Sequence, residues 1–549
     1  MKKLIAITLV LCLMLSGCAL DLGEYFRELG MLLGSFNAVA FEDMEYTRPD
    51  KSIYRDAVDA VYGELEKGSD VETLMDSVFG FYEQYHSFYT SYALANIHYS
   101  KDLTDLYWEE EYNYCIEFSA EVDASFDQLL YALADCPLKQ ELEAEEYFGE
   151  GFFDYYEGES LWDETFTAMM AEEAELQSRY YELSAEALSV PALSEEYFNR
   201  YGSKMAQLYV ELIALRQKIA AYAGYEDYPS FAYEFYYYRD YTPTQALSYM
   251  ASIQQQLVPL YRTLAYSDVW HIAARESTEE QTFSYAQSCA KAMGGTVEEA
   301  FYLMKNANLY DISYGENKFA ASFEVFLSSY GEPYIFMNPT TTVQDQLTFV
   351  HEFGHFCNDY ATFGGKSSVD VAEVFSQGLE YLSLCYCEDT EVLRKLKMAD
   401  SLCIYVEQSV YASFEQQAYA LEGEDLTVEN LYAIYEQTGK AYGLDIWNWD
   451  RRSFVAIQHF YTAPLYIISY VVSNDAALQL YQMEQAEAGT GLALYEQNLT
   501  TQEAGFLAFT EAAGLESPFA EGRVASVRKT MEEVLKYQSQ EYNHFPMKW

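Results

Sequence analysis

Two histidines and a glutamate within five residues form the pattern in this sequence that most clearly indicates chemistry. His351 and His355 are four residues apart, and Glu352 follows the first histidine in an H-E-x-x-H arrangement. On a helix, this spacing puts the two imidazoles one turn apart on one face, where they can share a Zn²⁺ ion. Glu352 lies beside the metal and can take a proton from a metal-bound water. The pattern therefore predicts a catalytic metal site with Glu352 as the general base.

A catalytic zinc needs a third protein ligand and an open position for water. Asp359 continues the four-residue spacing, but it lies about 12 Å along the helix axis from His351, too far to share one ion. We expect a second helix to follow the first and, as an antiparallel partner, to direct one carboxylate at the metal. The candidates on that helix are Asp370, Glu373 and Glu380, of which we favour Glu373.

A further histidine and two tyrosines lie more than a hundred residues beyond the metal motif. Histidine is rare in this chain, with seven in 549 residues, so His459 is informative. Tyr466 and Tyr470 follow it, four residues apart on a predicted helix. Imidazole N–H and phenol O–H groups are suitable donors to a tetrahedral oxyanion. Because the chain has 54 tyrosines, simple packing in the core is the alternative role for these two.

The elements that must position these residues are predicted to be mostly helices. Glycine (28) and proline (11) are scarce, and apolar residues recur every three or four positions, as in 120–133. Thr342 with Asp345 can cap the helix that carries the metal motif, and Gly364-Gly365 can end it. The one clear β signal is a short segment flanked by Gly and Pro, which predicts a strand or hairpin: Tyr334, Ile335, Phe336, Met337 and Asn338.

Three segments of the chain, 334–338, 351–355 and 371–376, resemble the thimet oligopeptidase and oligoendopeptidase F family of zinc peptidases, and the oligoendopeptidase F branch more closely. The resemblance implies a mainly α fold of two helical lobes flanking a deep substrate channel, with the small strand beside the zinc site. It implies one Zn²⁺ per chain with Glu373 as the third ligand, and a histidine and tyrosines facing the substrate carbonyl. The strand 334–338 would then be a free edge that binds peptide main chain, or else a strand that only packs.

The charge of the chain limits its partners. It has 87 acidic and 32 basic residues, a formal charge of −55. Nucleic-acid binding needs a basic surface, so this class is excluded. The same charge repels an anionic membrane surface, so contact with a membrane requires an anchor. Cationic peptides are the ligands that this charge would favour, although solubility alone also explains it.

The N-terminus predicts such an anchor. Lys2 and Lys3 precede an apolar run, 4–15, that is too short to span a bilayer, and the ending Leu15-Ser16-Gly17-Cys18 resembles a bacterial lipobox. We expect cleavage before Cys18, lipidation of that cysteine, and an extracytoplasmic protein anchored to a bacterial membrane by lipid. The predicted division is a signal peptide (1–17), an N-terminal helical lobe (18–194) and a catalytic zinc-peptidase region (195–549).

Together these features predict a zinc-dependent endopeptidase that hydrolyses short unfolded peptides by Glu352-assisted attack of metal-bound water. The expected partners are oligopeptide substrates and, through the lipid anchor only, a membrane; no nucleic acid is expected, and the chain is expected to be a monomer. The alternative is a non-catalytic surface lipoprotein that captures peptides. The glutamate of the metal motif argues against this alternative, because a binder does not need a base beside its metal.

Overall fold

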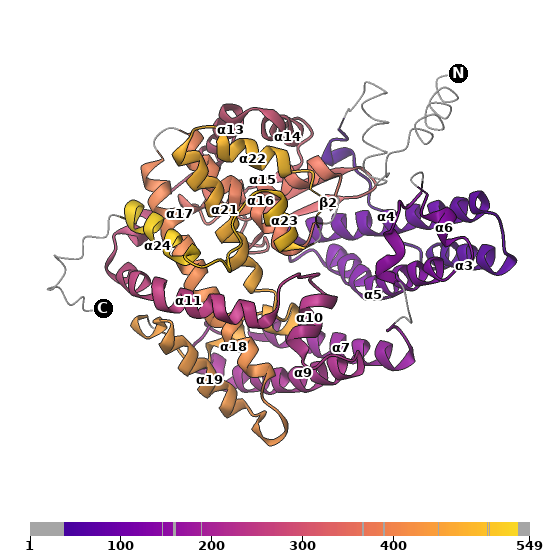
Figure 1. Cartoon of the computed structure of the whole chain (residues 1–549), viewed down its shortest axis with the longest axis horizontal. Helices are drawn as coiled ribbons and strands as arrows, with labels where there is room; N and C mark the ends of the chain where they lie inside the picture. Colours follow the sequence, from indigo (N-terminus) through magenta and orange to yellow (C-terminus); the bar gives the residue numbers. More distant parts are fainter. Residues whose placement is uncertain are drawn as a thin grey trace. The chain divides into compact units, whose positions relative to one another are not determined.

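The computed structural model describes residues 38–535 except 145–146, 157–160, 188, 365–366, 388–389, 448, 502 and 504 (Figure 1). These residues are mostly helical and include one three-stranded sheet, which confirms the predicted mainly α fold. The predicted signal peptide and Cys18 lie outside the described residues. Within the described part of the chain, no helix is both long and apolar enough to cross a membrane.

The chain divides into two compact units, each made of stretches that are separate in sequence. The first comprises the described residues up to Asp163 with Thr278–Thr341 and Glu352–Lys366, and the second comprises Glu164–Ser277, Thr342–His351 and the chain from Ser367 onward. This division differs from the boundary predicted at residue 194, because α7 (Glu164–Ala187) packs against α9 (Ser203–Tyr222) and belongs with the second unit. Helix α15 (Gln344–Thr362) contributes to both units.

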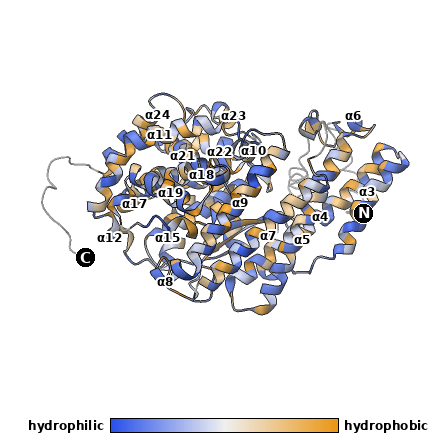
Figure 2. Cartoon of the chain, turned by 90° about the horizontal axis from the view of Figure 1, so that it is seen from below, coloured by the Kyte–Doolittle hydropathy of each residue, from blue (hydrophilic) through white to orange (hydrophobic). Residues whose placement is uncertain are grey.

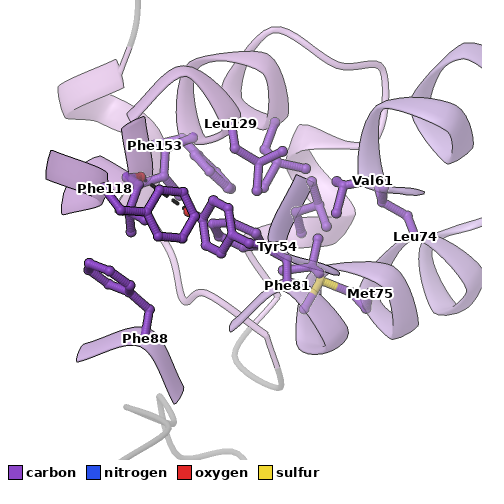
Figure 3. Close-up of a cluster of buried hydrophobic side chains, with 14 of the residues drawn as sticks. Tyr54, Val61, Leu74, Met75, Phe81, Phe88, Phe118, Leu129 and Phe153 are labelled. Carbon is purple, nitrogen blue, oxygen red and sulfur yellow. Dashed lines mark hydrogen bonds between the residues drawn. The ribbon is translucent and has the colours of Figure 1, made fainter. Parts of the chain in front are cut away.

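The core of the first unit is formed by long helices whose apolar faces meet (Figure 3). Tyr54, Phe81 and Phe118 are buried there, and the Tyr54 hydroxyl donates a hydrogen bond to the Val122 carbonyl at 3.2 Å. Burying each such aromatic ring contributes about 1.5–3 kcal/mol. The helices of this unit are η1 (Phe41–Asp43), α3 (Lys51–Lys67), α4 (Val71–Lys101), α5 (Leu106–Ala134), α6 (Lys139–Leu142), η2 (Phe152–Tyr156), α13 (Glu279–Met293) and α14 (Gly295–Asn306).

The sheet of the first unit consists of β1 (Tyr310–Asp311), β2 (Ser322–Leu327) and β3 (Glu332–Met337) in the order β1-β3-β2. Strands β2 and β3 form the predicted hairpin, and β1 pairs with β3 in parallel. Because β3 is the central strand and all its residues are buried, the prediction that Tyr334–Asn338 is a free edge is wrong. The segment was recognised from its apolar residues, and those same residues favour the middle of a sheet. Strands β1 and β2 are the two edges of the sheet.

The regular elements among the described residues of the second unit are helices, apart from one isolated β-bridge between Glu276 and Thr342. In Figure 2 many helices are blue on one side and orange on the other, as expected for helices that bury one face. Its best-packed pair is α16 (Val369–Tyr386) with α21 (Ile468–Ala486). Helix α11 starts at Pro243 with a capping box formed by Thr242 and Gln245. The other helices are α8 (Glu195–Tyr197), η3 (Phe198–Gly202), α10 (Tyr228–Phe235), α11 (Pro243–Tyr261), η4 (Arg262–Tyr266), α12 (Val269–Ala273), α17 (Glu391–Cys403), η5 (Ile404–Gln408), α18 (Ser409–Tyr419), η6 (Gly423–Asp425), α19 (Val428–Ala441), η7 (Leu444–Ile446), η8 (Ser453–Ala456), α20 (His459–Thr462), α22 (Thr490–Asn498), α23 (Phe506–Ala512) and α24 (Arg523–Leu535).

Helices α15 and α16 carry the metal motif and the favoured third ligand. At the start of α15 the Asp345 carboxylate accepts the Thr342 N–H at 3.0 Å, as the capping pattern predicts. The helix ends before Gly364, which has φ +71°, a left-handed conformation that favours glycine. Helix α16 then begins directly after Ser368, where the sequence predicted a second helix.

Candidate active site

The three predicted metal ligands lie together. One ligand atom from each of His351, His355 and Glu373 lies within 4.8 Å of the other two. His351 Nε2 and Glu373 Oε2 are 3.6 Å apart. Two atoms that each lie 2.0–2.1 Å from one tetrahedral ion are about 3.4 Å apart. The site therefore has the donor atoms and nearly the spacing that one metal ion requires.

Glu380 lies behind His351 rather than beside the metal position. Its Oε1 is 2.9 Å from His351 Nδ1, so this carboxylate can accept the Nδ1–H and leave Nε2 directed towards Glu373. Its Oε2 forms an ion pair at 2.8 Å with Lys397, whose side chain is completely buried. Burial alone would raise the pKa of Glu380, but Lys397 and His351 outweigh burial and lower it. Glu380 is thus a charged partner that orients the histidine.

Asp370, the other alternative ligand, is also engaged elsewhere. Its side chain is fully buried, and it forms an ion pair with Arg239 at 3.3 Å. It also accepts a hydrogen bond from the Tyr241 hydroxyl at 2.8 Å. Of the three acidic candidates on α16, only Glu373 shares the site of the two histidines.

The general-base candidate, Glu352, is 6% exposed. The Ser322 hydroxyl, on the edge strand β2, donates a hydrogen bond to Glu352 Oε1 at 2.7 Å. This bond fixes the direction of the carboxylate and ties it to β2. Sequence reasoning missed Ser322, because one serine at the start of a short strand carries no pattern.

A second pair of carboxyl groups lies near the same glutamate. Burial raises the pKa of Glu324 well above its usual value, and the charges of Asp359 and Glu352 raise it further. Burial also raises the pKa of Asp359 to about 7, although its hydrogen bond with Glu324 lowers the pKa in part. The pair therefore keeps a proton at neutral pH. Asp359, which lies too far along the helix from His351 to be a metal ligand, belongs to this protonated pair.

His459, Tyr466 and Tyr470 lie together beside the third ligand. The Tyr466 hydroxyl donates to Glu373 Oε1 at 3.2 Å, and the Tyr470 hydroxyl lies 3.4 Å from His459 Nε2. The ring centroids of His459 and Tyr466 are 5.6 Å apart. Burial lowers the pKa of His459, and the Glu373 charge only partly opposes this, so the imidazole is neutral at pH 7. A neutral imidazole and two phenols offer N–H and O–H donors without adding a charge.

Comparisons with known proteins show which family the chain resembles. A model of the peptidase M3 N-terminal domain matches residues 41–160, and a model of peptidase family M3 matches residues 306–501. The second range includes every residue of the candidate site named above except Arg239 and Tyr241. The chain is 32% identical over 185 residues to oligopeptidase PepF of Bacillus subtilis (strain 168), a match that covers 30% of this chain. The matched part spans 27% of the length of that relative.

Two solved structures are similar over nearly their whole length. An X-ray structure named as oligoendopeptidase F has a TM-score of 0.78 and 20% identity, covering 91% of this chain and 99% of its own. A structure of PZ peptidase A with an inhibitor has a TM-score of 0.76 and 17% identity, covering 90% of this chain and 99% of its own. At these identities the likeness shows a shared fold. The two family models together match more than half of the 549 residues, and the chain belongs to peptidase family M3.

Proposed function

We propose that this protein is a zinc-dependent endopeptidase that hydrolyses short unfolded peptides. The single observation that carries the proposal is the joint position of His351, His355 and Glu373 around one metal-sized space, with Glu352 next to the first ligand in the chain. Membership of peptidase family M3 supports a metal-dependent hydrolase.

Zinc is the metal that the donor set favours. Two imidazole nitrogens and one carboxylate oxygen are the ligands of many catalytic zinc sites, in which a fourth position stays open. When bound there, Zn²⁺ supplies Lewis-acid chemistry that activates a water molecule and polarises the scissile carbonyl. The contact of His351 Nδ1 with Glu380 Oε1 at 2.9 Å supports the proposal, because ligating histidines usually donate their other N–H to a carboxylate.

The residues of the chain then perform the proton transfers and the charge stabilisation. Glu352 accepts the proton of the attacking water and passes it to the leaving amine, and Ser322 holds the carboxylate in position for both steps. General-base assistance of this kind is worth about 10²–10⁴-fold in rate. His459 and Tyr470 donate hydrogen bonds to the oxyanion that forms from the carbonyl, with Tyr466 beside them.

The free edge of the sheet is the place at which we propose that substrate main chain binds. Strand β2 has a neighbouring strand on one side only, and an extended peptide can add to such an edge as a further strand. The hydrogen bond from Ser322, the first residue of β2, to Glu352 puts the general base beside this edge. A peptide paired with β2 would therefore present a peptide bond to Glu352, whereas a folded protein cannot offer an extended strand.

The direct test is to incubate the purified protein with a mixed library of short peptides. We expect internal cleavage that is abolished by a chelator and restored by Zn²⁺. Binding of the peptides without any cleavage by the metal-loaded protein would instead identify the peptide-capturing alternative. Efficient cleavage of folded proteins would contradict the proposed substrate class.

We further propose that the protein acts outside the cytoplasm, held to a bacterial membrane by lipid on Cys18. The supporting sequence feature is the lipobox-like ending Leu15–Cys18. Cys289 and Cys387 each take part in a disulfide bond, and disulfides persist in oxidising compartments and are rare in the cytosol. Expression with a labelled fatty acid should label the wild-type protein and a Cys385→Ser control, but not Cys18→Ser. Labelling of the Cys18→Ser variant would contradict the anchor.

A further inference from the structure

The segment that carries His459, Tyr466 and Tyr470 has little regular structure of its own. Helix α20 has four residues, and five residues separate it from α21. Leu465, between them, has φ +65°, which is unfavourable for a residue with a branched side chain. Such a conformation persists only when surrounding groups determine it. Contacts from elsewhere in the second unit must therefore hold this segment.

Arg216, on α9, holds the first part of the segment. The residue is completely buried, and its guanidinium donates to the carbonyls of Phe460 at 2.7 Å and Tyr461 at 2.5 Å. Carbonyls in the last turn of a helix have no partner within that helix. Glu173, on α7, balances the charge by accepting from Arg216 Nε at 2.7 Å.

Arg239, between α10 and α11, holds the second part. Its side chain is completely buried, and Nη1 donates to the Leu465 carbonyl at 2.9 Å. Nη2 donates to the Tyr466 carbonyl at 3.3 Å and to Ser469 Oγ at 2.8 Å. Asp370 balances this charge. One guanidinium thus joins the loop, the start of α21 and the helix that carries Glu373.

Two neighbours complete the set of contacts around the left-handed residue. The Tyr237 hydroxyl donates to the Pro464 carbonyl at 2.7 Å, and the Glu415 carboxyl group accepts the Leu465 N–H at 2.8 Å. Three consecutive residues, 464–466, therefore have their backbone groups bonded to buried side chains that are far away in sequence.

We propose that Arg216 and Arg239 are positioning residues that clamp residues 459–470, so that His459 and the two tyrosines keep the orientation in which they act on the substrate. The catalytic part of this inference rests on the proposed function, whereas the clamp itself does not. A guanidinium has five donors in a fixed plane and can serve several carbonyls and a carboxylate at once, which a lysine ammonium cannot do in the same geometry.

The experiment compares Arg216→Lys, Arg239→Lys and Tyr237→Phe with a matched control, Arg523→Lys. Arg523 is also a buried arginine paired with a carboxylate on α21, but its hydrogen bonds go to Asp475 and Gln482. Three quantities are measured on the metal-loaded proteins: amide hydrogen exchange across residues 459–470, and kcat and KM for one cleaved peptide. Bound zinc and thermal stability are recorded for each variant.

For both arginine variants we expect amide exchange in residues 459–470 to rise about 10-fold or more, because hydrogen bonds from a charged donor are lost. We expect kcat to fall about 10- to 100-fold with KM changed less than about 3-fold and zinc still bound, since the affected groups act in the transition state. Tyr237→Phe changes no charge and should show the same pattern on a smaller scale. Arg523→Lys should lower thermal stability without either effect.

The clamp is refuted if exchange in residues 459–470 and kcat both stay at wild-type values in Arg239→Lys and Tyr237→Phe. An equal loss of kcat in Arg523→Lys would also overturn it, since general destabilisation would then explain the result. Should Arg239→Lys fail to fold, Tyr237→Phe decides. If the wild-type protein cleaves no peptide, the proposed function fails, but hydrogen exchange still decides whether the clamp exists.

Discussion

Replacing Glu380 by Gln should weaken metal binding although Glu380 is not a ligand. The wild-type carboxylate lies 2.9 Å from His351 Nδ1 and forms an ion pair with buried Lys397 at 2.8 Å. A glutamine can still accept the Nδ1–H through its carbonyl oxygen, but it removes the negative charge that makes the imidazole a better ligand. Loss of such a partner typically costs 10- to 100-fold in metal affinity. We therefore expect the Kd for Zn²⁺ to rise by about 10- to 100-fold.

The same substitution leaves Lys397 buried without its ion-pair partner. Breaking a buried pair from one side typically costs about 3–5 kcal/mol, so the unfolding temperature of the metal-free protein should fall as well. A control must separate these effects. Asp475→Asn breaks the buried pair with Arg523, whose side chain is 2% exposed, and should lower stability without changing the Kd for zinc.

The assay is competition for zinc against a chelator of known affinity, with thermal unfolding of the metal-free proteins measured in parallel. A Kd in Glu380→Gln equal to that of the wild type would refute the reasoning that this carboxylate tunes His351. A Kd raised equally in Asp475→Asn would refute it too, because loss of stability would then account for both variants.

Three other outcomes can be tested on stability and rate. Burial raises the pKa of Glu415 to about 8 and that of Glu332 to about 7, whereas a glutamate in an unfolded chain has a pKa of about 4.3. The unfolded chain therefore loses these protons at lower pH than the folded protein does, and the unfolding free energy should fall as the pH rises from about 5 to 8. Urea titrations across this pH range should show a smaller fall for Glu415→Gln than for the wild type. Gly364→Ala should lower the unfolding free energy by about 2 kcal/mol or more, because φ is +71° and a Cβ would lie 2.2 Å from the Phe326 ring. Adding Phe326→Ala to the Gly364→Ala chain should recover part of this loss. Wild-type stability of Gly364→Ala would contradict the geometry. With a formal charge of −55, kcat/KM for a Lys/Arg-rich peptide should fall between about 0.01 M and 0.5 M salt, and a salt-independent rate would show that the charge does not steer substrate.

The sequence predicted the parts of the site that depend on local spacing. The two histidines and Glu352 follow from one turn of helix, and the cap at Thr342 follows from its local hydrogen bond with Asp345. These features depend on residues within a few positions of one another, so they can be inferred without knowledge of the tertiary fold.

Features that depend on distant partners could not be predicted. The apolar composition of 334–338 indicates a strand, but only the pairing with β1 on one side and β2 on the other makes it central. Spacing favours Glu373 but leaves Asp370 and Glu380 open as competing ligands, and only the structure shows that Arg239 and Lys397 engage them. Arg216 contacts backbone carbonyls 244 and 245 residues away, a relation that no local pattern records.

The most direct test of the account is Glu352→Gln, measured for bound metal and for peptide cleavage on the same sample. The substitution keeps the size of the side chain and its bond from Ser322 but removes its ability to accept a proton. We predict one zinc per chain, as in the wild type, with peptide turnover lower by about 10²-fold or more. Wild-type turnover by the zinc-loaded variant would contradict the central claim that Glu352 is the general base of a metallopeptidase.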